Sequence, residues 1–384
     1  MAKIALICDT HYGVRNDNPV FHAYFDKCME HFFSVLEEKN INHIIHLGDL
    51  FDRRKYLSYL TSKACRDSFL IPIEGMEIDT HIIAGNHDRY YKDVCFVNAL
   101  DEVVTGRYKT ITTYNFPEVI NIDGLDILLV PWIDQSNAQM TYDLIKSTKA
   151  EVVMGHLEMK GFEQLKGNIS THGDDVDVYS KFDLVFSGHY HHKSSKGNIH
   201  YLGAFGEYTW SDYNDPRGFT IFDTSTREFE FIRNPYPMFK MMAYDDVKDT
   251  NIMETINASD YSEYKDTYVK VLCVNRTNAY AFDMMMDKLY KANPIDISVI
   301  EDISSFTDTD EAGEIDQTQD TPTILDSYIN GLTLPVSNDN MKSFMRDVYT
   351  EALSNWALQT EDRVPFNLLM EDGYLLVNEN YTLA

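Results

Sequence analysis

The segment IALICDTHYG, residues 4–13, shows the pattern that decides the fold: an apolar run that ends in polar side chains. The same pattern returns in HIIHLGDLFD, residues 43–52, and in HIIAGNHD, residues 81–88. Three further apolar runs are ILLV at residues 127–130, VVM at 152–154 and LVFS at 184–187. Short apolar runs separated by longer amphipathic stretches predict buried strands that alternate with helices, so we expect a layered α/β fold.

The amphipathic stretch between the first two runs predicts a long helix. Asp17 or Asn18 can cap its amino terminus, and Pro19 suits its first turn. Apolar side chains then recur at helical spacing, at Phe21, Phe25, Cys28, Phe32 and Val35. This spacing predicts a helix face that packs into the core.

The composition limits the class of protein. The chain has 384 residues, of which 44% are hydrophobic, and this is enough for one large domain with smaller additions. The formal net charge of -28 disfavours binding nucleic acid by bulk electrostatics, because that affinity comes from Lys and Arg displacing counterions. Five scattered cysteines without a C-x-x-C pair disfavour a disulfide framework and a zinc knuckle. No apolar stretch reaches the roughly 18 to 20 residues of a membrane span, so we expect a cytoplasmic protein with no membrane partner.

Two changes of pattern predict the first domain boundaries. The alternating strands and helices occupy residues 1–235 and end at the prolines of NPYPMF. Residues 236–302 then predict a small domain, with a strand at 268–274, a helix at 279–292 and a strand at 296–302.

The last part of the chain changes pattern again. Residues 303–323 are acidic, contain no Lys or Arg and show no periodicity, so we expect a solvated linker. Residues 324–384 contain a predicted helix with a stripe of Met341, Met345, Val348, Ala352 and Trp356. That stripe needs a surface to pack against, either within the chain or on a partner.

The chemistry is expected where the apolar runs stop, because α/β folds bind ligands at the ends of their strands. Five of the six runs end in D-T-H, G-D-L-F-D, G-N-H-D, G-H and G-H-Y-H-H. These motifs supply carboxylate, amide and imidazole groups at Asp9, His11, Asp49, Asn86, His87, His156, His189 and His191. A single histidine is more often structural, but five such motifs at five strand ends predict one shared site.

The residue types indicate which metal this site would bind. Oxygen and imidazole ligands without a thiolate disfavour a structural zinc site and suit manganese, with magnesium or iron as alternatives. The ligands exceed what one ion can use while leaving room for a substrate, so we expect two ions. Asp49 is the candidate for a carboxylate that bridges them.

The set D-x-H, G-D-x-x-D, G-N-H-D, G-H and G-H-x-H resembles the calcineurin-like metallophosphoesterases. Within that superfamily, DTHYG, GDLFDRRK, GHYHH and the small domain with a helical tail resemble the SbcD-type double-strand-break-repair nucleases, including phage recombination nucleases. The resemblance implies a four-layer β-sandwich flanked by helices, with a small α+β capping domain and a C-terminal helical segment.

The resemblance also implies a role for each motif residue. One ion would be held by Asp9, His11, Asp49 and His191, and the other by Asp49, Asn86, His156 and His189. His87 would be the general acid, with Asp88 orienting it. Asp52 differs from the histidine that some relatives carry after G-D-L-F, which leaves its role open.

The function implied is a metal-dependent DNA exonuclease and endonuclease in recombination, repair and replication. In the SbcD-type family, the C-terminal helices bind an SMC-like ATPase and the catalytic domains form a homodimer. A phage-encoded member would work in the host cytoplasm. Two alternatives stay open: a phosphatase or phosphodiesterase for small molecules or phosphoproteins, and a DNA-end scaffold with an idle site.

Basic residues follow the metal motifs although the chain as a whole is acidic. They include Arg15, Arg53, Arg54, Arg89 and Lys193. If those turns share one rim, the rim would contact DNA phosphates around the scissile bond. The competing interpretation is that each of these residues pairs with a neighbouring carboxylate.

Overall fold

The computed structural model describes residues 2–165, 168–301 and 342. The expected linker at 303–323 and the expected helical segment at 324–384 therefore lie outside the described residues, apart from Lys342. The described residues up to Glu301 belong to one compact unit.

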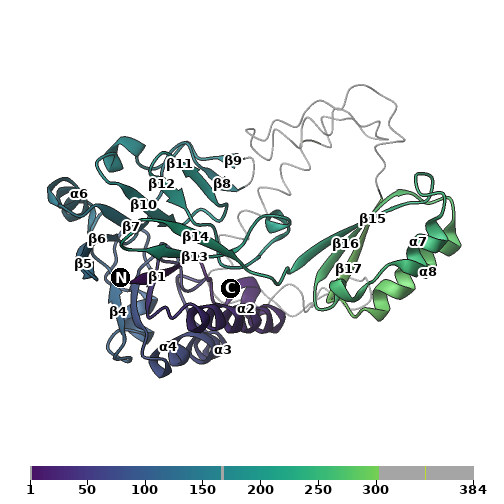
Figure 1. Ribbon diagram of the computed structural model, residues 1–384, viewed down its shortest axis with the longest axis horizontal. Coiled ribbons are helices and arrows are strands. Elements are labelled where there is room, and N and C mark those ends of the chain that lie inside the picture. The colour runs from purple at the N-terminus through teal and green to yellow at the C-terminus, as the bar shows by residue number, and fades with distance from the viewer. Residues whose placement is uncertain (1, 166–167, 302–341, 343–384) are drawn as a thin grey trace, which may run out of the picture. The chain divides into compact units, whose positions relative to one another are not determined.

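Two six-stranded mixed sheets form the body of this unit (Figure 1). The first sheet has the order β14 (Phe229–Arg233), β13 (Gly218–Asp223), β1 (Lys3–Ile7), β2 (His43–His46), β3 (Asp79–Ile83) and β4 (Ile111–Tyr114). The second has the order β11 (Ser194–Lys196), β12 (Ile199–Tyr201), β10 (Leu184–Gly188), β7 (Val152–His156), β6 (Leu125–Val130) and β5 (Glu118–Ile122). All six predicted strands are present, and they form the parallel centres of the two sheets.

Apolar side chains fill the space between the two sheets and also cover their outer faces. The inner layer contains Leu6, Ile45, Ile127, Met154 and Phe186, each of them buried. Helices pack on the outer face of each sheet: α2 (Pro19–Glu38), α3 (Tyr59–Cys65) and α5 (Ala99–Val103) on the first, and α6 (Ala138–Ser147) on the second. The order helix, sheet, sheet, helix confirms the predicted four-layer α/β fold.

The helix α2 forms as its sequence predicts. Asn18 caps it by accepting a hydrogen bond from the Val20 amide at 2.9 Å, and Pro19 is its first residue. The predicted apolar face is buried from Phe21 to Val35. This face anchors α2 against the first sheet, beside the turn that follows β1.

Shorter elements complete the body of the unit. They are α1 (Val14–Asp17), η1 (Arg66–Leu70), α4 (Ile71–Gly75), β8 (Glu163–Leu165), β9 (Asn168–Ile169), η2 (Val176–Tyr179) and η3 (Trp210–Asp212). No helix in the described part of the chain is both long and apolar enough to cross a membrane.

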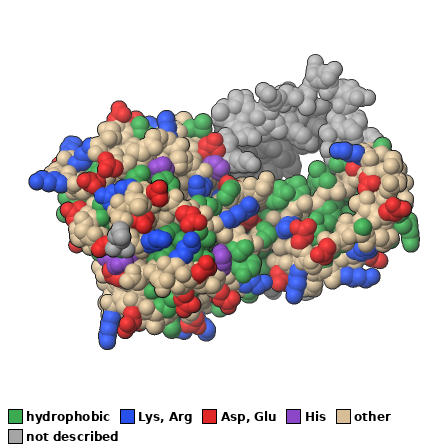
Figure 2. All heavy atoms as spheres, viewed as in Figure 1, with side chains coloured by type: hydrophobic (Ala, Val, Ile, Leu, Met, Phe, Trp, Pro, Cys, Tyr) green, Lys and Arg blue, Asp and Glu red, His purple; other side chains and the backbone are tan. Residues whose placement is uncertain are grey.

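Residues 239–301 form a small α+β domain with its own core. Its parallel sheet has the order β15 (Phe239–Asp245), β16 (Tyr268–Asn275) and β17 (Asp296–Glu301). The helices α7 (Ile252–Ala258) and α8 (Ala279–Lys291) cover one face, and η4 (Ser262–Tyr264) is a short turn. Figure 2 shows hydrophobic side chains on the surface of this domain. Met241 of β15 and Ile300 of β17 are each 41% exposed. The predicted elements of this domain are present, and β15 and α7 are additional.

Candidate metal centre

The five sequence motifs meet at one edge of the sandwich. Asp9, Asp49 and Asn86 follow β1, β2 and β3 of the first sheet, while His156 ends β7 and His189 follows β10 of the second. Backbone amides join the two sheets there, because the His189 N–H donates to both carboxylate oxygens of Asp9 at 3.1 Å. The packing of one sheet on the other therefore brings together residues that are up to 182 positions apart in the chain, from Asp9 to His191.

The predicted ligand atoms form two groups that meet at Asp49. Within each group the ligand atoms lie within 4.8 Å of one another: Asp9, His11 and His191 in the first, and Asp49, His156 and His189 in the second. One Asp49 oxygen, Oδ2, lies 3.7 Å from His11 Nε2 and 3.4 Å from His156 Nε2. A single carboxylate oxygen between the two groups is the arrangement expected of a bridging ligand.

Asn86 joins the second group through its side-chain oxygen. Asn86 Oδ1 lies 3.0 Å from His156 Nε2 and 2.9 Å from His189 Nδ1. In the first group, His11 Nε2 and His191 Nε2 lie 3.1 Å apart. All seven predicted ligands therefore face a common centre.

The backbone at these ligands has an unusual conformation. Asp9, His11, Asp49 and His189 all have positive φ, at 50°, 45°, 55° and 86°. Few non-glycine residues adopt this region, and each costs about 1–3 kcal/mol when the surrounding structure imposes it. Four of the seven predicted ligands thus have a backbone conformation that non-glycine residues seldom adopt.

Two glycines allow the strand ends to approach so closely. A Cβ on Gly48, which has φ of 89°, would lie 2.4 Å from His156 Nδ1. A Cβ on Gly85 would lie 2.1 Å from Asp49 Oδ1. These contacts are too short for any side chain, so the ligand arrangement requires glycine at both positions.

The hydrogen bonds of His156 indicate that this centre suits a cation. His156 Nδ1 lies 2.7 Å from the Leu47 carbonyl oxygen, which places the ring proton on Nδ1. When the His156 ring is neutral, as a metal ligand must be, its Nε2 presents a lone pair toward Asn86 Oδ1 and Asp49 Oδ2. Three electron-pair donors that face one another without a hydrogen between them form a stable arrangement when a metal ion lies among them.

Burial and charge set the protonation of the ligands. Burial lowers the pKa of His11 well below its usual value, and burial together with His156 lowers the pKa of His189 to about 3. Burial alone would lower the pKa of His156, but the carboxylates of Asp49 and Asp9 outweigh it and raise this pKa to about 9. Neutral imidazoles are the form that binds metals, and the field at His156 favours positive charge.

His87 lies beside the centre without belonging to either ligand group. Its backbone N–H donates to Asp49 Oδ1 at 2.7 Å, and its Nδ1 lies 2.6 Å from the Asp52 carbonyl oxygen. The His87 ring meets the His11 ring edge-on, with centroids 4.9 Å apart. The Nδ1 contact leaves Nε2 as the nitrogen available for proton transfer.

Asp88 bonds to backbone amides, so its expected effect on His87 would be indirect and stays a prediction. The buried Asp88 carboxylate accepts hydrogen bonds from the amides of Gly85 at 2.8 Å, Phe51 at 3.0 Å and Leu50 at 3.4 Å. Burial and the nearby charge of Asp49 raise the pKa of Asp88 to about 6. Asp88 therefore ties the loop after β2 to the loop after β3.

Asp52 supplies the contact to His87 that was expected of Asp88. Besides its carbonyl contact with His87, its carboxylate Oδ1 lies 3.6 Å from His11 Nδ1. His11, Asp52 and His87 form a third group with ligand atoms within 4.8 Å of one another. The structure thus places Asp52 at the edge of the centre.

The sequence profile of the family described as "Calcineurin-like phosphoesterase" matches residues 2–193, which include every one of these groups. The chain belongs to the calcineurin-like phosphoesterase family. This membership confirms the resemblance found in the motifs, and the family depends on divalent metal ions.

Three relatives of this phosphoesterase have names that describe nucleases. "Exonuclease subunit 1" of Enterobacteria phage T4 is 28% identical over 353 residues, which cover 91% of this chain and 99% of that protein. The D subunit of nuclease SbcCD from Staphylococcus epidermidis is 24% identical over 339 residues, covering 78% of this chain and 84% of that protein. The D subunit of nuclease SbcCD from Staphylococcus saprophyticus is 21% identical over 220 residues, which cover 55% of this chain and 57% of that protein.

The expected basic rim of the phosphoesterase is smaller than its sequence suggests. Arg89 is only 1% exposed and forms an ion pair with the buried Asp134, so it cannot reach DNA. Arg53 is held by hydrogen bonds to Asn16 and Tyr56. Arg89 thus follows the competing interpretation, because its guanidinium compensates a buried carboxylate.

The other basic residues of the rim remain at or near the surface. Arg15 is exposed, and its Nε donates to the Tyr208 carbonyl oxygen at 2.8 Å. Arg54 and Lys193 are half-buried, and Lys193 Nζ lies 5.2 Å from the centroid of the Phe231 ring. These three residues still provide positive charge near the motifs.

Sequence reasoning missed two aromatic residues of the phosphoesterase site. The Trp132 ring lies 4.9 Å from the His189 ring and 6.0 Å from the His156 ring, measured between centroids. With His156 and Tyr142, Trp132 lines a cavity of about 180 Å³. The sequence did contain a signal for Trp132, because the apolar run at residues 127–130 is a central strand, β6, and Pro131-Trp132 follows directly at its end. Tyr208, the second, has no such signal, since it lies outside every motif.

Proposed function

We propose that this chain is the nuclease subunit of a recombination and repair complex, and that it hydrolyses DNA phosphodiester bonds with two divalent metal ions bound. The observation that carries the proposal is the convergence of the seven ligands on Asp49, with His87 directly beside them. Manganese is the ion that the mixed oxygen and imidazole ligands suit best, with magnesium or iron as alternatives. The names of the three relatives support DNA as the substrate.

The ligands divide between the two ions as follows. Asp9, His11, Asp49 and His191 hold one ion, and Asp49, Asn86, His156 and His189 hold the other. When bound, such a pair lowers the pKa of a coordinated water and neutralises the charge of the phosphate. Four of these residues have positive φ, a conformation that the surrounding structure must impose on them.

His87 acts as the general acid in this proposal. Its Nδ1 proton is directed at the Asp52 carbonyl oxygen, so the ring keeps one orientation and presents Nε2 outward. A proton donated from Nε2 to the departing sugar oxygen avoids the release of an alkoxide. Asp52 is the residue that positions His87, and Asp88 stabilises the loop on which His87 lies.

The acidic composition requires help in binding DNA. Arg15, Arg54 and Lys193 would contact phosphates near the site, with Arg53 nearby. The rest of the affinity would come from an SMC-like ATPase partner bound by residues 324–384, and from pairing of two catalytic domains in a homodimer. Exonuclease and endonuclease activity would then serve recombination, repair and replication, in the host cytoplasm for a phage protein.

The main test is manganese-dependent cleavage of linear duplex DNA by the wild type and by His87→Ser. We expect His87→Ser to lose about 10²- to 10⁴-fold in cleavage rate, because it removes the general acid. Its manganese affinity, measured by titration calorimetry, should stay unchanged because His87 is not a ligand. His200→Ser is the matched control: His200 lies on β12, half-buried against Ser195, and this variant should cleave normally.

The same assay separates the alternatives. If the wild type does not cleave DNA but hydrolyses a small phosphoester such as bis(p-nitrophenyl) phosphate, the result would favour a small-molecule phosphoesterase. DNA binding without hydrolysis of either substrate would favour an idle scaffold.

A second test addresses the basic rim. Neutralising Arg53 and Arg54 together should reduce the slope of log affinity for DNA against log salt concentration, by about 0.9 for each phosphate that the protein no longer neutralises. An unchanged slope would remove these two residues from the interface.

A further inference from the structure

Two adjacent residues, Glu207 and Tyr208, contact the metal ligands on one side and the start of the small domain on the other. They lie in the loop between β12 and η3, which carries none of the sequence motifs. Both side chains are buried, with Glu207 6% exposed and Tyr208 3% exposed. Neither residue faces the cavity beside His156.

Tyr208 supports the first group of ligands. Its hydroxyl donates a hydrogen bond to the Asp9 carbonyl oxygen. Its ring meets the His11 ring edge-on at 5.5 Å and the His191 ring at 5.6 Å between centroids. On its far side the ring stacks on Phe25 of α2 at 5.7 Å. Tyr208 is therefore confined between α2 and three of the predicted ligands of one ion.

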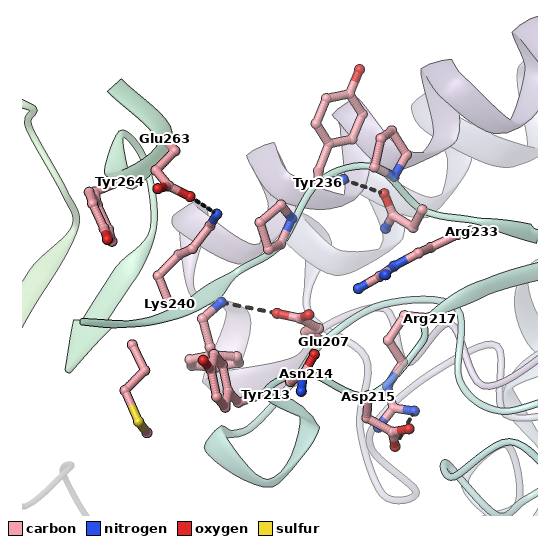
Figure 3. A pocket seen from close by; sticks show the side chains of 15 residues that line it. Glu207, Tyr213, Asn214, Asp215, Arg217, Arg233, Tyr236, Lys240, Glu263 and Tyr264 are labelled. Atoms are coloured by element: carbon pink, nitrogen blue, oxygen red, sulfur yellow. Dashed lines mark hydrogen bonds and ion pairs between the residues drawn. The ribbon is translucent and has the colours of Figure 1, made fainter. Parts of the chain in front are cut away.

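Glu207 holds the start of β15. One carboxylate oxygen, Oε2, accepts hydrogen bonds from the Met238 amide at 2.8 Å and the Phe239 amide at 3.0 Å. Figure 3 shows this carboxylate pointing at the backbone of β15, on the wall of a cavity of about 670 Å³. The Glu207 amide itself donates to the Tyr24 hydroxyl at 3.0 Å. The carboxylate thus binds the backbone at the start of the small domain's first strand.

A buried ion pair fixes the same loop to a ligand from a second direction. Asp212 Oδ2 accepts from the Tyr208 amide at 2.7 Å, and Asp212 Oδ1 accepts from Arg217 at 2.7 Å. Arg217 also donates to the carbonyl oxygen of His191 and pairs with Asp215 at 2.9 Å. These buried bonds connect the loop at residues 207–208 to the backbone of His191, one of the predicted ligands.

We propose that Glu207 and Tyr208 form a mechanical link through which the anchoring of β15 sets the metal affinity of the site formed by Asp9, His11 and His191. Tyr208 is the positioning residue for these ligands, and Glu207 connects it to the small domain. The link rests on the proposed function, since it acts on the ions of that site. Its consequence is reciprocal: metal binding also strengthens the anchoring of β15.

The first experiment uses the unmodified full chain and hydrogen exchange with and without manganese. Metal binding should slow exchange of the Met238 and Phe239 amides, and Tyr208→Phe should reduce this slowing at equal occupancy of the metal site. Unchanged exchange at these amides in wild type that binds manganese would overturn the link. If wild type binds no manganese at all, the proposed function fails instead, so the two failures can be told apart.

The second experiment is a double-mutant cycle on manganese affinity, measured from the electron paramagnetic resonance signal of the free ion. Tyr208→Phe should weaken binding about 10- to 100-fold, as loss of a residue that supports a ligand does. Glu207→Ala should weaken it about 2- to 30-fold. In the Tyr208→Phe background, Glu207→Ala should have a smaller effect than in the wild type, because the hydroxyl part of the link is already lost while the bond from the Tyr208 amide to Asp212 remains.

Glu207→Gln is the matched control for the cycle. Both amides donate to the same oxygen of Glu207, so the amide oxygen of Gln can accept both bonds and should restore wild-type affinity. If the fold losses of manganese affinity caused by Glu207→Ala and Tyr208→Phe simply multiply in the double mutant, the two residues act independently. That result would overturn the proposal. Weak binding by Glu207→Gln would do so as well.

Discussion

The sandwich and the small domain both use parallel strands, yet their strand ends differ completely. At the ends of β1, β2, β3, β7 and β10 the side chains are polar and mostly buried, and four ligands have positive φ. Of the described residues 239–301, Thr267 is the one polar side chain that is buried. Positive φ occurs there at Asp266 and Asn293, which are not buried. The buried carboxylates and imidazoles at these strand ends therefore reflect the site they form and are not required by parallel sheets as such.

This contrast shows what each region needs for stability. The small domain packs Tyr244, Val271, Phe282 and Leu289 into an ordinary apolar core. The sandwich edge brings carboxylates and imidazoles out of water, which costs free energy unless opposite charge compensates them. Bound cations would supply that compensation. Changes at the sandwich edge should therefore act mainly on metal and activity, and changes in the small domain mainly on stability.

The largest effect is expected from Asp49→Asn at the sandwich edge. The variant keeps an oxygen for the His87 amide but loses the charge that both ligand groups share, so we expect weak manganese binding and cleavage below that of His87→Ser. Calorimetry with manganese and DNA cleavage assays measure both quantities. Asp126→Asn, which changes an exposed carboxylate bonded to Asn121, is the control and should behave as wild type. Normal cleavage by Asp49→Asn would break the comparison.

The opposite effect is expected from Leu289→Ala in the small domain. Leu289 is fully buried in the apolar core, so its truncation should lower the free energy of unfolding by about 2–5 kcal/mol. Hydrolysis of bis(p-nitrophenyl) phosphate per folded molecule should stay near the wild-type rate. Urea denaturation measures the expected loss of stability, and the hydrolysis assay measures the expected unchanged rate. A variant that keeps its stability but loses hydrolysis would contradict the division between the regions.

Gly85→Ala tests how tightly the ligand edge is packed. The added Cβ would lie 2.1 Å from Asp49 Oδ1 and 2.3 Å from the Asp49 amide nitrogen, so we expect a loss of about 1–3 kcal/mol and weaker manganese binding. Gly75→Ala at the end of α4 meets no atom within 4 Å and should instead stabilise the protein by about 0.4–1 kcal/mol. Thermal unfolding measures the stability of both variants. Equal changes in stability for Gly85→Ala and Gly75→Ala would contradict the tight packing inferred at Gly85.

The smallest effect concerns Glu207, a buried carboxylate that no proposed ion compensates. Burial raises the pKa of Glu207 above its usual value, which is about 4.3 in an unfolded chain. Between these two pKa values the native state binds more protons, so the free energy of unfolding falls as the pH rises, by at most about 1.4 kcal/mol per pH unit. Glu207→Gln has no carboxyl group at this position and therefore lacks this pH-dependent loss of stability. Its free energy of unfolding should rise relative to that of the wild type as the pH rises above about 4.3. Urea titrations across this range would refute the idea if the two curves stayed parallel.

Much of this protein follows from its sequence alone. The six central strands, the helix over Pro19–Glu38, the strands and helix at residues 268–301 and the meeting of the seven candidate ligands could be predicted because periodicity and strand-end motifs are local signals. The strands β4, β5, β8, β9 and β11 to β15 were not predicted, since short edge and return strands depend on the neighbours they pair with.

Only the tertiary structure decided which groups around the ligands act together. Asp52 contacts His87 while Asp88 holds backbone amides, and Arg89 is buried with Asp134 although its sequence position suggested a surface role. Tyr208 reaches Asp9 across 199 positions of the chain. A sequence specifies which residue ends a strand, but the side chain that faces it depends on how two sheets and their loops pack, and that packing is a property of the whole fold.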